Sequence, residues 1–448
     1  MKRFVSLIFP TLIFCLSTQT SAQIPSRYDG WKKPSYYRGY NFTGDTRIKT
    51  LQDFLDYAKT GATFAYICSP GYRTVDAPYS LDDKYVQITN DYVSYCHAAG
   101  LHYALNIREG PGRQDVWKDG LVDFSKSTIW TDPVVQRLYA SMLREVVDRY
   151  KYDSLFIGIS PITEPNPLFD KFYIDTASLE QLLVSNKIDL QAITQLCVDS
   201  IRSASRDIPI LIQGPAYSSP EFIPLTPVIH DPYVVYEFHA YRPHEYVYAA
   251  DTSTLVYPGN FISYIQLKIT RFDKTYLKDT VFKYVYDRHN ETDAPILLGE
   301  FGLEFPQAGG VQFLSDLATS AIENGWHFAW WNYRGPPDAW DYEIWQPEYW
   351  TAVLKSFEGN SSVQQTLISG DEITLSPNPC SSSVILGIHS ERDHDMISIY
   401  NVLGAKVKQL QTRNDRVEIS TEDLNAGEYL VSVDSPTGVL QKRLVVIK

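Results

Sequence analysis

Two acidic residues stand at or shortly after the ends of apolar segments, where an ionised side chain is costly unless it has a function. Glu300 closes the apolar run 296–299, and Glu164 follows the apolar run 155–159. Two carboxyl groups about 5 Å apart can hydrolyse a glycosidic bond, because one protonates the leaving oxygen while the other attacks the anomeric carbon. The carboxyl ends of the strands in a parallel β/α barrel converge on one face, so such a fold would bring these two acids together.

The elements that would position the two acids are short apolar segments that alternate with amphipathic ones. Their near-continuous apolar character is typical of parallel strands that are buried on both faces. The eight strand candidates are residues 36–41, 64–67, 103–107, 155–159, 210–212, 234–239, 296–300 and 327–331. This alternation predicts an α/β fold with a (β/α)8 TIM barrel. A doubly wound sheet is the alternative, but no Gly-x-Gly-x-x-Gly motif follows the first strand.

Helical segments are expected between these strands, near residues 47–60, 81–99, 133–146, 189–205 and 310–324. The clearest helix start is Asp132-Pro133, which combines a capping side chain with a proline at the first helical position.

Composition limits the classes of function. The 448-residue chain has a formal net charge of −13, and such a field disfavours nucleic acids and anionic membranes as partners. The N-terminus carries Lys2 and Arg3 before a short apolar run that ends in small residues. This pattern predicts a secretory signal peptide over residues 1–22, with a lipoprotein signal around Cys15 as the alternative.

The remaining cysteines are Cys68, Cys96, Cys197 and Cys380, and none of them forms a Cys-x-x-Cys pair. Buried free thiols are expected, although Cys68 and Cys96 could be bridged in an oxidising compartment. His-Glu-x-x-His is absent from the sequence as well, so neither a metal nor another cofactor is expected.

The amino-acid composition of the chain changes after Phe357. A polar stretch over residues 359–373 reads as a linker, and alternating strand patterns then continue to the C-terminus. The predicted organisation is a signal peptide (1–22), a barrel domain (23–358), a linker (359–373) and a small all-β sandwich (374–448). A monomer is expected.

The barrel segments resemble glycoside hydrolase family 5, the cellulase and mannanase group, over most of residues 36–357. The resemblance rests on Glu164-Pro165, on the segment Gly299–Gly302 and on the aromatic strands 235–241 and 325–331. It implies that Glu164 is the acid/base and that Glu300 is the nucleophile of a retaining β-glycosidase. Of this pair, Glu164 would need the raised pKa and Glu300 would need to stay ionised.

The same resemblance implies a set of substrate-binding residues: Asn41, Arg108, Thr163, His239, Tyr241 and Trp331. Tyr241 would hydrogen-bond the nucleophile, and Trp331 would form the floor of a sugar subsite. Three positions depart from the family pattern. Thr163 stands in place of an asparagine, Tyr66 in place of an arginine, and Arg108 in place of a histidine. Arg108 is expected to supply the charge that Tyr66 lacks.

Residues 374–448 resemble the type A sorting domain of type IX secretion, through Leu375–Pro379, Ile397–Gly404, Leu424–Tyr429 and Leu444–Lys448. The resemblance implies that the type IX secretion machinery is a partner and that the protein is secreted or held at the cell surface. A carbohydrate-binding sandwich is the alternative, although the strands carry few aromatic residues for stacking on sugars.

The sequence therefore predicts a secreted retaining glycoside hydrolase that cleaves β-glycosidic bonds of a polysaccharide or oligosaccharide. A non-catalytic glycan-binding barrel is the alternative, because Thr163 replaces the family's asparagine. A transglycosylase is a third possibility. The sequence names neither the sugar nor the choice between endo and exo action.

Overall fold

The computed structural model describes residues 26–448 except 45–46, 115–126, 169–174, 249–254, 264–267, 336–339, 359–372, 389–395, 402–405, 413 and 436–437. The predicted signal peptide lies outside the described residues. So does the predicted linker, apart from Ile373, which is the first residue of a strand.

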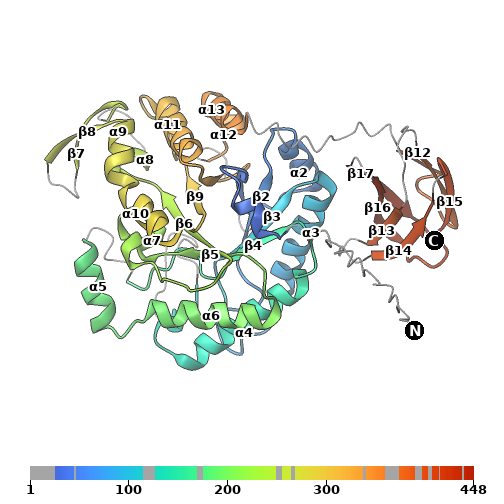
Figure 1. Cartoon of the computed structure of the whole chain (residues 1–448), viewed down its shortest axis with the longest axis horizontal. Coiled ribbons are helices and arrows are strands. Elements are labelled where there is room, and N and C mark those ends of the chain that lie inside the picture. The colour runs from blue at the N-terminus through green and yellow to red at the C-terminus, as the bar shows by residue number, and fades with distance from the viewer. Residues whose placement is uncertain are drawn as a thin grey trace, which may run out of the picture.

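Eight parallel strands close into a barrel in the order β1-β10-β9-β6-β5-β4-β3-β2 (Figure 1). Their bounds are β1 Arg38–Thr43, β2 Phe64–Ser69, β3 His102–Ile107, β4 Phe156–Ser160, β5 Ile210–Gln213, β6 Val234–Ala240, β9 Ile296–Phe301 and β10 His327–Trp330. Almost every residue of these strands is buried, as expected for strands covered on both faces. The predicted TIM barrel is confirmed, and closure of the sheet excludes the doubly wound alternative.

Helices surround the barrel and supply the amphipathic segments that the sequence predicted. They include α2 Leu51–Ala58, α3 Asp83–Ala99, α4 Pro133–Tyr150, α6 Leu190–Ala204 and α11 Gly310–Glu323. Asp132 caps α4 by accepting hydrogen bonds from the backbone N–H groups of Val134 and Val135. The described residues also hold α5 Thr176–Ser185, α10 Lys283–Thr292, α12 Tyr342–Trp345 and α13 Pro347–Phe357.

A hairpin of β7 Gly259–Ser263 and β8 Lys268–Phe272 is inserted between β6 and β9, and the sequence analysis did not predict it. It precedes α9 Lys274–Tyr276 and a π-helical turn over Leu277–Val281. Phe261 and Phe272 of the hairpin pack against Tyr276, so the insertion has its own aromatic contacts. Because of this insertion, the seventh strand of the barrel is β9.

The N-terminal end of the barrel is covered by the short helix α1 Tyr28–Trp31. Trp31 donates its indole N–H to the carbonyl of Ile157 at 2.8 Å, and Tyr28 donates its hydroxyl to the carbonyl of Val234 at 2.6 Å. These contacts seal one end of the barrel, so the opposite end, where the strands finish, is left for a functional site.

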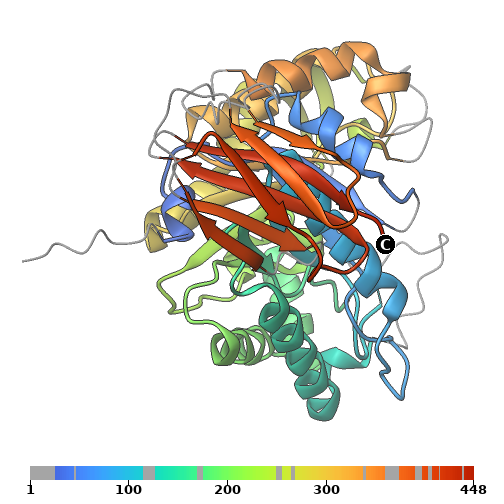
Figure 2. The same cartoon turned by 90° about the vertical axis from the view of Figure 1, so that its right-hand side faces the viewer.

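The C-terminal strands form two antiparallel sheets, which Figure 2 shows in red. One sheet holds β11 Ile373–Ser376, β12 Ser383–Ile388 and β15 Arg416–Ser420. The other holds β13 Met396–Asn401, β14 Lys406–Gln411, β16 Gly427–Ser435 and β17 Gly438–Val446. A separate apolar core fills this unit, as the predicted all-β sandwich requires.

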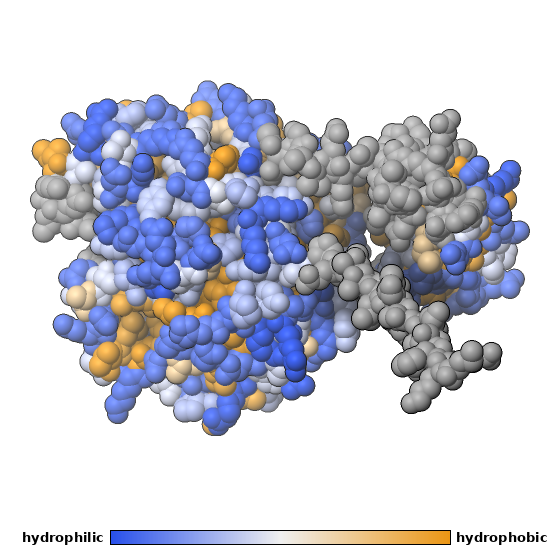
Figure 3. Space-filling view, viewed as in Figure 1, coloured by the Kyte–Doolittle hydropathy of each residue, from blue (hydrophilic) through white to orange (hydrophobic). Residues whose placement is uncertain are grey.

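The visible surface is mainly polar, and the cysteines are in the state that the sequence predicted. The face of the molecule in Figure 3 is mainly hydrophilic, with apolar side chains gathered around α5 and α6. All four cysteines that the structure describes, Cys68, Cys96, Cys197 and Cys380, are buried free thiols.

Candidate active site

Glu164 and Glu300 meet where the barrel strands finish. Glu300 is part of β9 and Glu164 follows β4, and both residues are buried. A carboxylate oxygen of Glu164 lies within 4.8 Å of one from Glu300. This separation matches the spacing of about 5 Å in retaining glycosidases and is shorter than the roughly 6.5–9.5 Å of inverting ones.

Glu300 accepts hydrogen bonds from a phenol and a guanidinium. Tyr241 donates its hydroxyl to Oε2 at 3.1 Å, and Nη1 of Arg108 lies 3.2 Å from Oε1. Burial and the charge of Glu300 raise the pKa of Tyr241 well above its ordinary value, so Tyr241 is a neutral donor near pH 7. These two donors favour the ionised form of the carboxyl group that they contact.

The pKa of Glu300 differs from the expectation. Burial raises it to about 7, the charges of Glu164 and Glu237 add to the shift, and His239 and Arg108 oppose it. The sequence analysis assigned the raised pKa to Glu164, but the side chain of Glu300 is the more deeply buried, at 3% exposure against 9%. The charge of Glu164 is one of the causes that raise the pKa of Glu300, so the ionisation of Glu300 depends on its neighbour.

The backbone of Glu164 adopts a conformation that is unusual for a residue with a side chain. Its φ is +47°, in the left-handed region, and strain of this kind is commonly found at functional sites. Its N–H donates to Oε1 of Gln213 at 2.7 Å, and Gln213 in turn donates to the hydroxyl of Ser160 at 2.9 Å. These bonds tie Glu164 to the ends of β4 and β5 and aim its side chain across the barrel.

His239 lies between the two acids. A register shift in the pairing of β6 with β9 places His239 directly beside Glu300. Its Nδ1 lies 2.7 Å from Oε1 of Glu164 and 3.7 Å from Oε2 of Glu300. Burial alone would lower the pKa of this ring, but the surrounding carboxylates, with Glu300 the largest contributor, raise it to about 10. His239 is therefore a cation at neutral pH.

Among the described residues, Glu164, His239 and Glu300 form the one group whose ligand atoms are close enough together to hold a metal ion. Two cationic side chains already lie against these carboxylates: the protonated ring of His239, and Arg108, which is 3.6 Å from Glu164. The donor set therefore fits a carboxylate pair neutralised by protein cations better than it fits a metal centre.

Arg108 also contacts the aromatic floor of the site. Its guanidinium carbon lies 5.2 Å from the centre of a ring of Trp331, in cation–π geometry. Trp331 follows β10 directly and is only partly buried, whereas the neighbouring Trp330 is fully buried and donates to the hydroxyl of Ser356 at 3.1 Å. Trp330 therefore belongs to the packed interior, and the role of Trp331 as a surface for sugar stays a prediction.

Two residues that were expected to bind substrate direct their polar groups to the protein instead. The amide of Asn41 donates to the carbonyls of Gly299, at 2.7 Å, and Trp330. The hydroxyl of Thr163 donates to the amide oxygen of Asn106. Asn41 and Thr163 therefore brace the strand ends, and a direct contact of either residue with substrate stays a prediction.

Sequence reasoning missed three residues that support the site. Arg113, which is 3% exposed, donates to the carbonyls of Ile107, Arg108 and Thr163 and so holds the ends of two strands. Glu237 is buried beneath His239, and Gln213 holds Glu164. Period-2 alternation along β6 could have revealed Glu237, because residues 237, 239 and 241 share one face of that strand.

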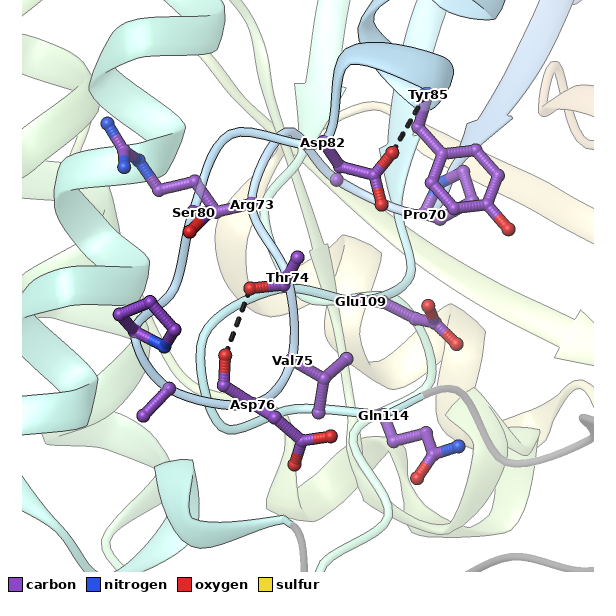
Figure 4. A pocket seen from close by; sticks show the side chains of 13 residues that line it. Pro70, Arg73, Thr74, Val75, Asp76, Ser80, Asp82, Tyr85, Glu109 and Gln114 are labelled. Atoms are coloured by element: carbon purple, nitrogen blue, oxygen red, sulfur yellow. Dashed lines mark hydrogen bonds between the residues drawn. The ribbon is translucent and has the colours of Figure 1, made fainter.

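A cavity of about 550 Å³ opens between the segment 70–82, which leads from β2 into α3, and residues 109–114 after β3. Figure 4 shows the side chains of Asp76, Asp82 and Glu109 around it. None of the described residues that line this cavity is one of the two acids or a residue that contacts them. Polar and apolar atoms contribute about equally to its lining, so the cavity does not by itself identify a ligand.

A family model described as cellulase (glycosyl hydrolase family 5) matches residues 36–335. The chain belongs to glycoside hydrolase family 5. Among curated proteins, it is similar to Endoglucanase C of Acetivibrio thermocellus and to an endoglucanase of Clostridium sp., with 24% identity over 219 residues in each case. The matched region is 44% of this chain and spans only 56% of the length of each relative.

Solved structures show the same fold. An endoglucanase from the hyperthermophilic Thermotoga maritima superposes with a TM-score of 0.54 at 14% identity, covering 74% of this chain and all of that one. The cellulose synthase subunit Z of Clostridioides difficile superposes with a TM-score of 0.51 at 17% identity, covering 71% of this chain and 99% of that one.

The C-terminal unit matches a second family model, a secretion system C-terminal sorting domain, over residues 374–448. The resemblance to the type IX sorting domain is therefore confirmed, and it marks the protein for secretion or display at the cell surface. Over the described residues, the helices are all too short or too polar to cross a membrane.

Proposed function

We propose that this family 5 protein is a secreted retaining β-glycosidase that acts within β-glucan chains. Glu164 is the acid/base and Glu300 is the nucleophile. The observation that carries the proposal is the separation of at most 4.8 Å between their nearest carboxylate oxygens. Endo action on glucan is supported by the names of the curated relatives, which are endoglucanases.

The reaction has two displacements. In the first, Glu164 passes a proton to the leaving oxygen, while ionised Glu300 attacks the anomeric carbon. Tyr241 and Arg108 hold the attacking oxygens in place. In the second, Glu164 takes a proton from water, which then releases the sugar from Glu300 with overall retention. Trp331 supplies an aromatic surface for the sugar ring.

The chain organisation is part of the proposal. Residues 1–22 are removed on export, residues 23–358 carry the catalysis, residues 359–373 link the two folded units, and residues 374–448 engage the type IX secretion machinery. The secreted enzyme acts as a monomer.

A panel of polysaccharides tests the activity: carboxymethylcellulose, barley β-glucan, glucomannan and xylan, incubated with the full chain. The products should carry reducing ends that form first as the β-anomer, as NMR can follow. Glu300→Ala should abolish hydrolysis with the fold unchanged by circular dichroism. Normal turnover by that variant would refute the assignment.

Reaction of the variants with azide distinguishes the acid/base from the nucleophile. With an aryl β-glycoside, Glu164→Ala should give a β-glycosyl azide, because azide attacks the glycosyl-enzyme. Glu300→Ala should give an α-glycosyl azide, because azide attacks the substrate directly from the opposite face. Any other pairing of variant and anomer would contradict the assignment.

A non-catalytic glycan-binding barrel remains the second candidate. One observation favours it: Arg108 lies over one face of the Trp331 ring and contacts both acids, so that face is occupied by the protein itself. Binding of cello-oligosaccharides with no product from any polysaccharide would support this candidate.

A further inference from the structure

A third carboxylate lies beneath the catalytic pair, and the double displacement does not use it. Glu237 belongs to β6, and its side chain has no exposure to solvent. Tyr66 of β2 donates its hydroxyl to Oε2 of Glu237 at 2.7 Å, and Nε2 of His239 lies 3.2 Å from Oε1. A buried carboxylate is costly, so this one is either neutralised for packing alone or has a task.

Glu237 connects to the acid/base through one imidazole ring. The opposite nitrogen of His239, Nδ1, lies 2.7 Å from Glu164. Once Glu164 has given up its proton, both carboxylates can only accept hydrogen bonds, so His239 between them must then carry a proton on each nitrogen. The line Tyr66–Glu237–His239–Glu164 therefore runs from the barrel interior to the acid/base.

Gly299, next to the nucleophile Glu300, leaves space for the side chain of Glu237. A Cβ atom at Gly299 would collide with the carboxylate of Glu237, so any side chain at this position would force Glu237 to shift. Tyr66, the donor to Glu237, stands where the family resemblance has an arginine. Burial and the charge of Glu237 raise the pKa of Tyr66 well above its ordinary value, so Tyr66 remains a neutral donor.

We propose that Glu237, held by Tyr66, is a positioning residue that keeps His239 doubly protonated and thereby stabilises Glu164 in the ionised form that the second displacement needs. The inference rests on the proposed retaining mechanism. In the second displacement, Glu164 must accept a proton from water, and a cationic donor 2.7 Å away favours its ionised form before that transfer.

The charge around His239 is set by groups from several elements. They are Glu164 after β4, Glu237 of β6 and Glu300 of β9. These acids are contacted in turn by Tyr66 of β2, Arg108 after β3 and Tyr241 after β6. Glu237→Gln removes one negative charge and keeps the shape of the side chain. His239 then loses a partner that favours its proton, and its pKa falls from about 10. A neutral His239 would no longer favour ionised Glu164.

The test compares the full-length wild type with Glu237→Gln on 2,4-dinitrophenyl β-cellobioside, whose leaving group needs no acid. The glycosyl-enzyme should form at nearly the normal rate and hydrolyse more slowly, by about 10- to 100-fold as for the loss of other orienting partners. The expected signature is a pre-steady-state burst, with kcat and KM falling together and kcat/KM almost unchanged. Glu237→Asp should restore part of kcat, and Tyr66→Phe should shift it in the same direction by less.

A purely structural role gives a different result: kcat/KM falls, KM does not, and no burst appears, which would overturn the inference. Histidine-selective ¹⁵N NMR of the wild type at pH 8 reports the protonation state of His239, and this result does not depend on the folding of the Glu237 variants. The ring of His239, assigned with His239→Asn, should show two protonated nitrogens, and a neutral ring would overturn the inference. If the wild type hydrolyses no glycoside at all, the proposed function fails as well. If the wild type hydrolyses the glycoside and Glu237→Gln has the same kinetics, the inference about Glu237 fails and the proposed function stands.

Discussion

Arg108 offers the sharpest test of the electrostatics of the pair. Replacement by methionine keeps much of the side-chain volume over Trp331 and removes the charge 3.2 Å from Glu300. At that distance the attraction between unit charges is about 5 kcal/mol for an effective dielectric constant of about 20. Arg108 is also shared with Glu164, and it is 11% exposed, so part of this attraction is already screened.

A loss of a quarter to a half of that attraction would raise the pKa of Glu300 by about 1–2 units, at about 1.4 kcal/mol per unit. Its pKa starts at about 7. The ionised share at pH 7 would then fall from about one half to between about one tenth and one hundredth. Because the nucleophile must be ionised, kcat/KM at pH 7 should fall about 5- to 50-fold and recover as the pH rises.

The assay is the pH profile of kcat/KM for 2,4-dinitrophenyl β-cellobioside, whose leaving group makes the profile report on the nucleophile. The acidic limb of Arg108→Met should move up by about 1–2 pH units. Arg108→Lys is the matched control, since it retains the charge and should move the limb less. An equal loss of activity at every pH, with the limb in place, would refute the electrostatic reasoning and leave Arg108 a role in shape alone.

Three further outcomes are expected. Gly299→Ala should destabilise the fold by about 1–3 kcal/mol through collision with Glu237, as chemical denaturation can measure, and Glu237→Ala in the same chain should relieve much of that loss. Trp330→Ala should lower the free energy of unfolding by about 3–5 kcal/mol, whereas Trp331→Ala should mainly raise KM; equal effects on stability would contradict their separate roles. Deletion of residues 374–448 should leave hydrolysis by the purified barrel intact and abolish export, as immunoblots of the culture medium would show.

The barrel was predictable because its strands carry a strong local signal. Segments such as 296–300 are apolar without interruption, and this pattern marks a strand covered on both sides. The β7–β8 hairpin left no comparable signal, since its short strands carry polar residues such as Asn260, Lys268 and Arg271. An insertion of this kind becomes visible only when its aromatic residues are seen to pack on the neighbouring helix.

The part of the site that depends on the convergence of the strand ends could be predicted from the sequence. Glu164, Glu300, His239 and Tyr241 come together because their strands do. The partners of Asn41 and Thr163 depend on the direction of single side chains, which sequence spacing does not determine. The raised pKa of Glu300 could not be predicted from the sequence either, because it depends on small differences in burial between two neighbouring carboxyl groups.

Mechanism-based labelling tests the central claim most directly. The full-length protein is treated with 2,4-dinitrophenyl 2-deoxy-2-fluoro-β-cellobioside, digested and analysed by mass spectrometry. The fluorine slows release of the sugar, so the account predicts one stoichiometric adduct, on the peptide that contains Glu300 and on that side chain. Hydrolytic activity without any adduct, or an adduct on Glu164 or another residue, would contradict the assignment of the two carboxylates.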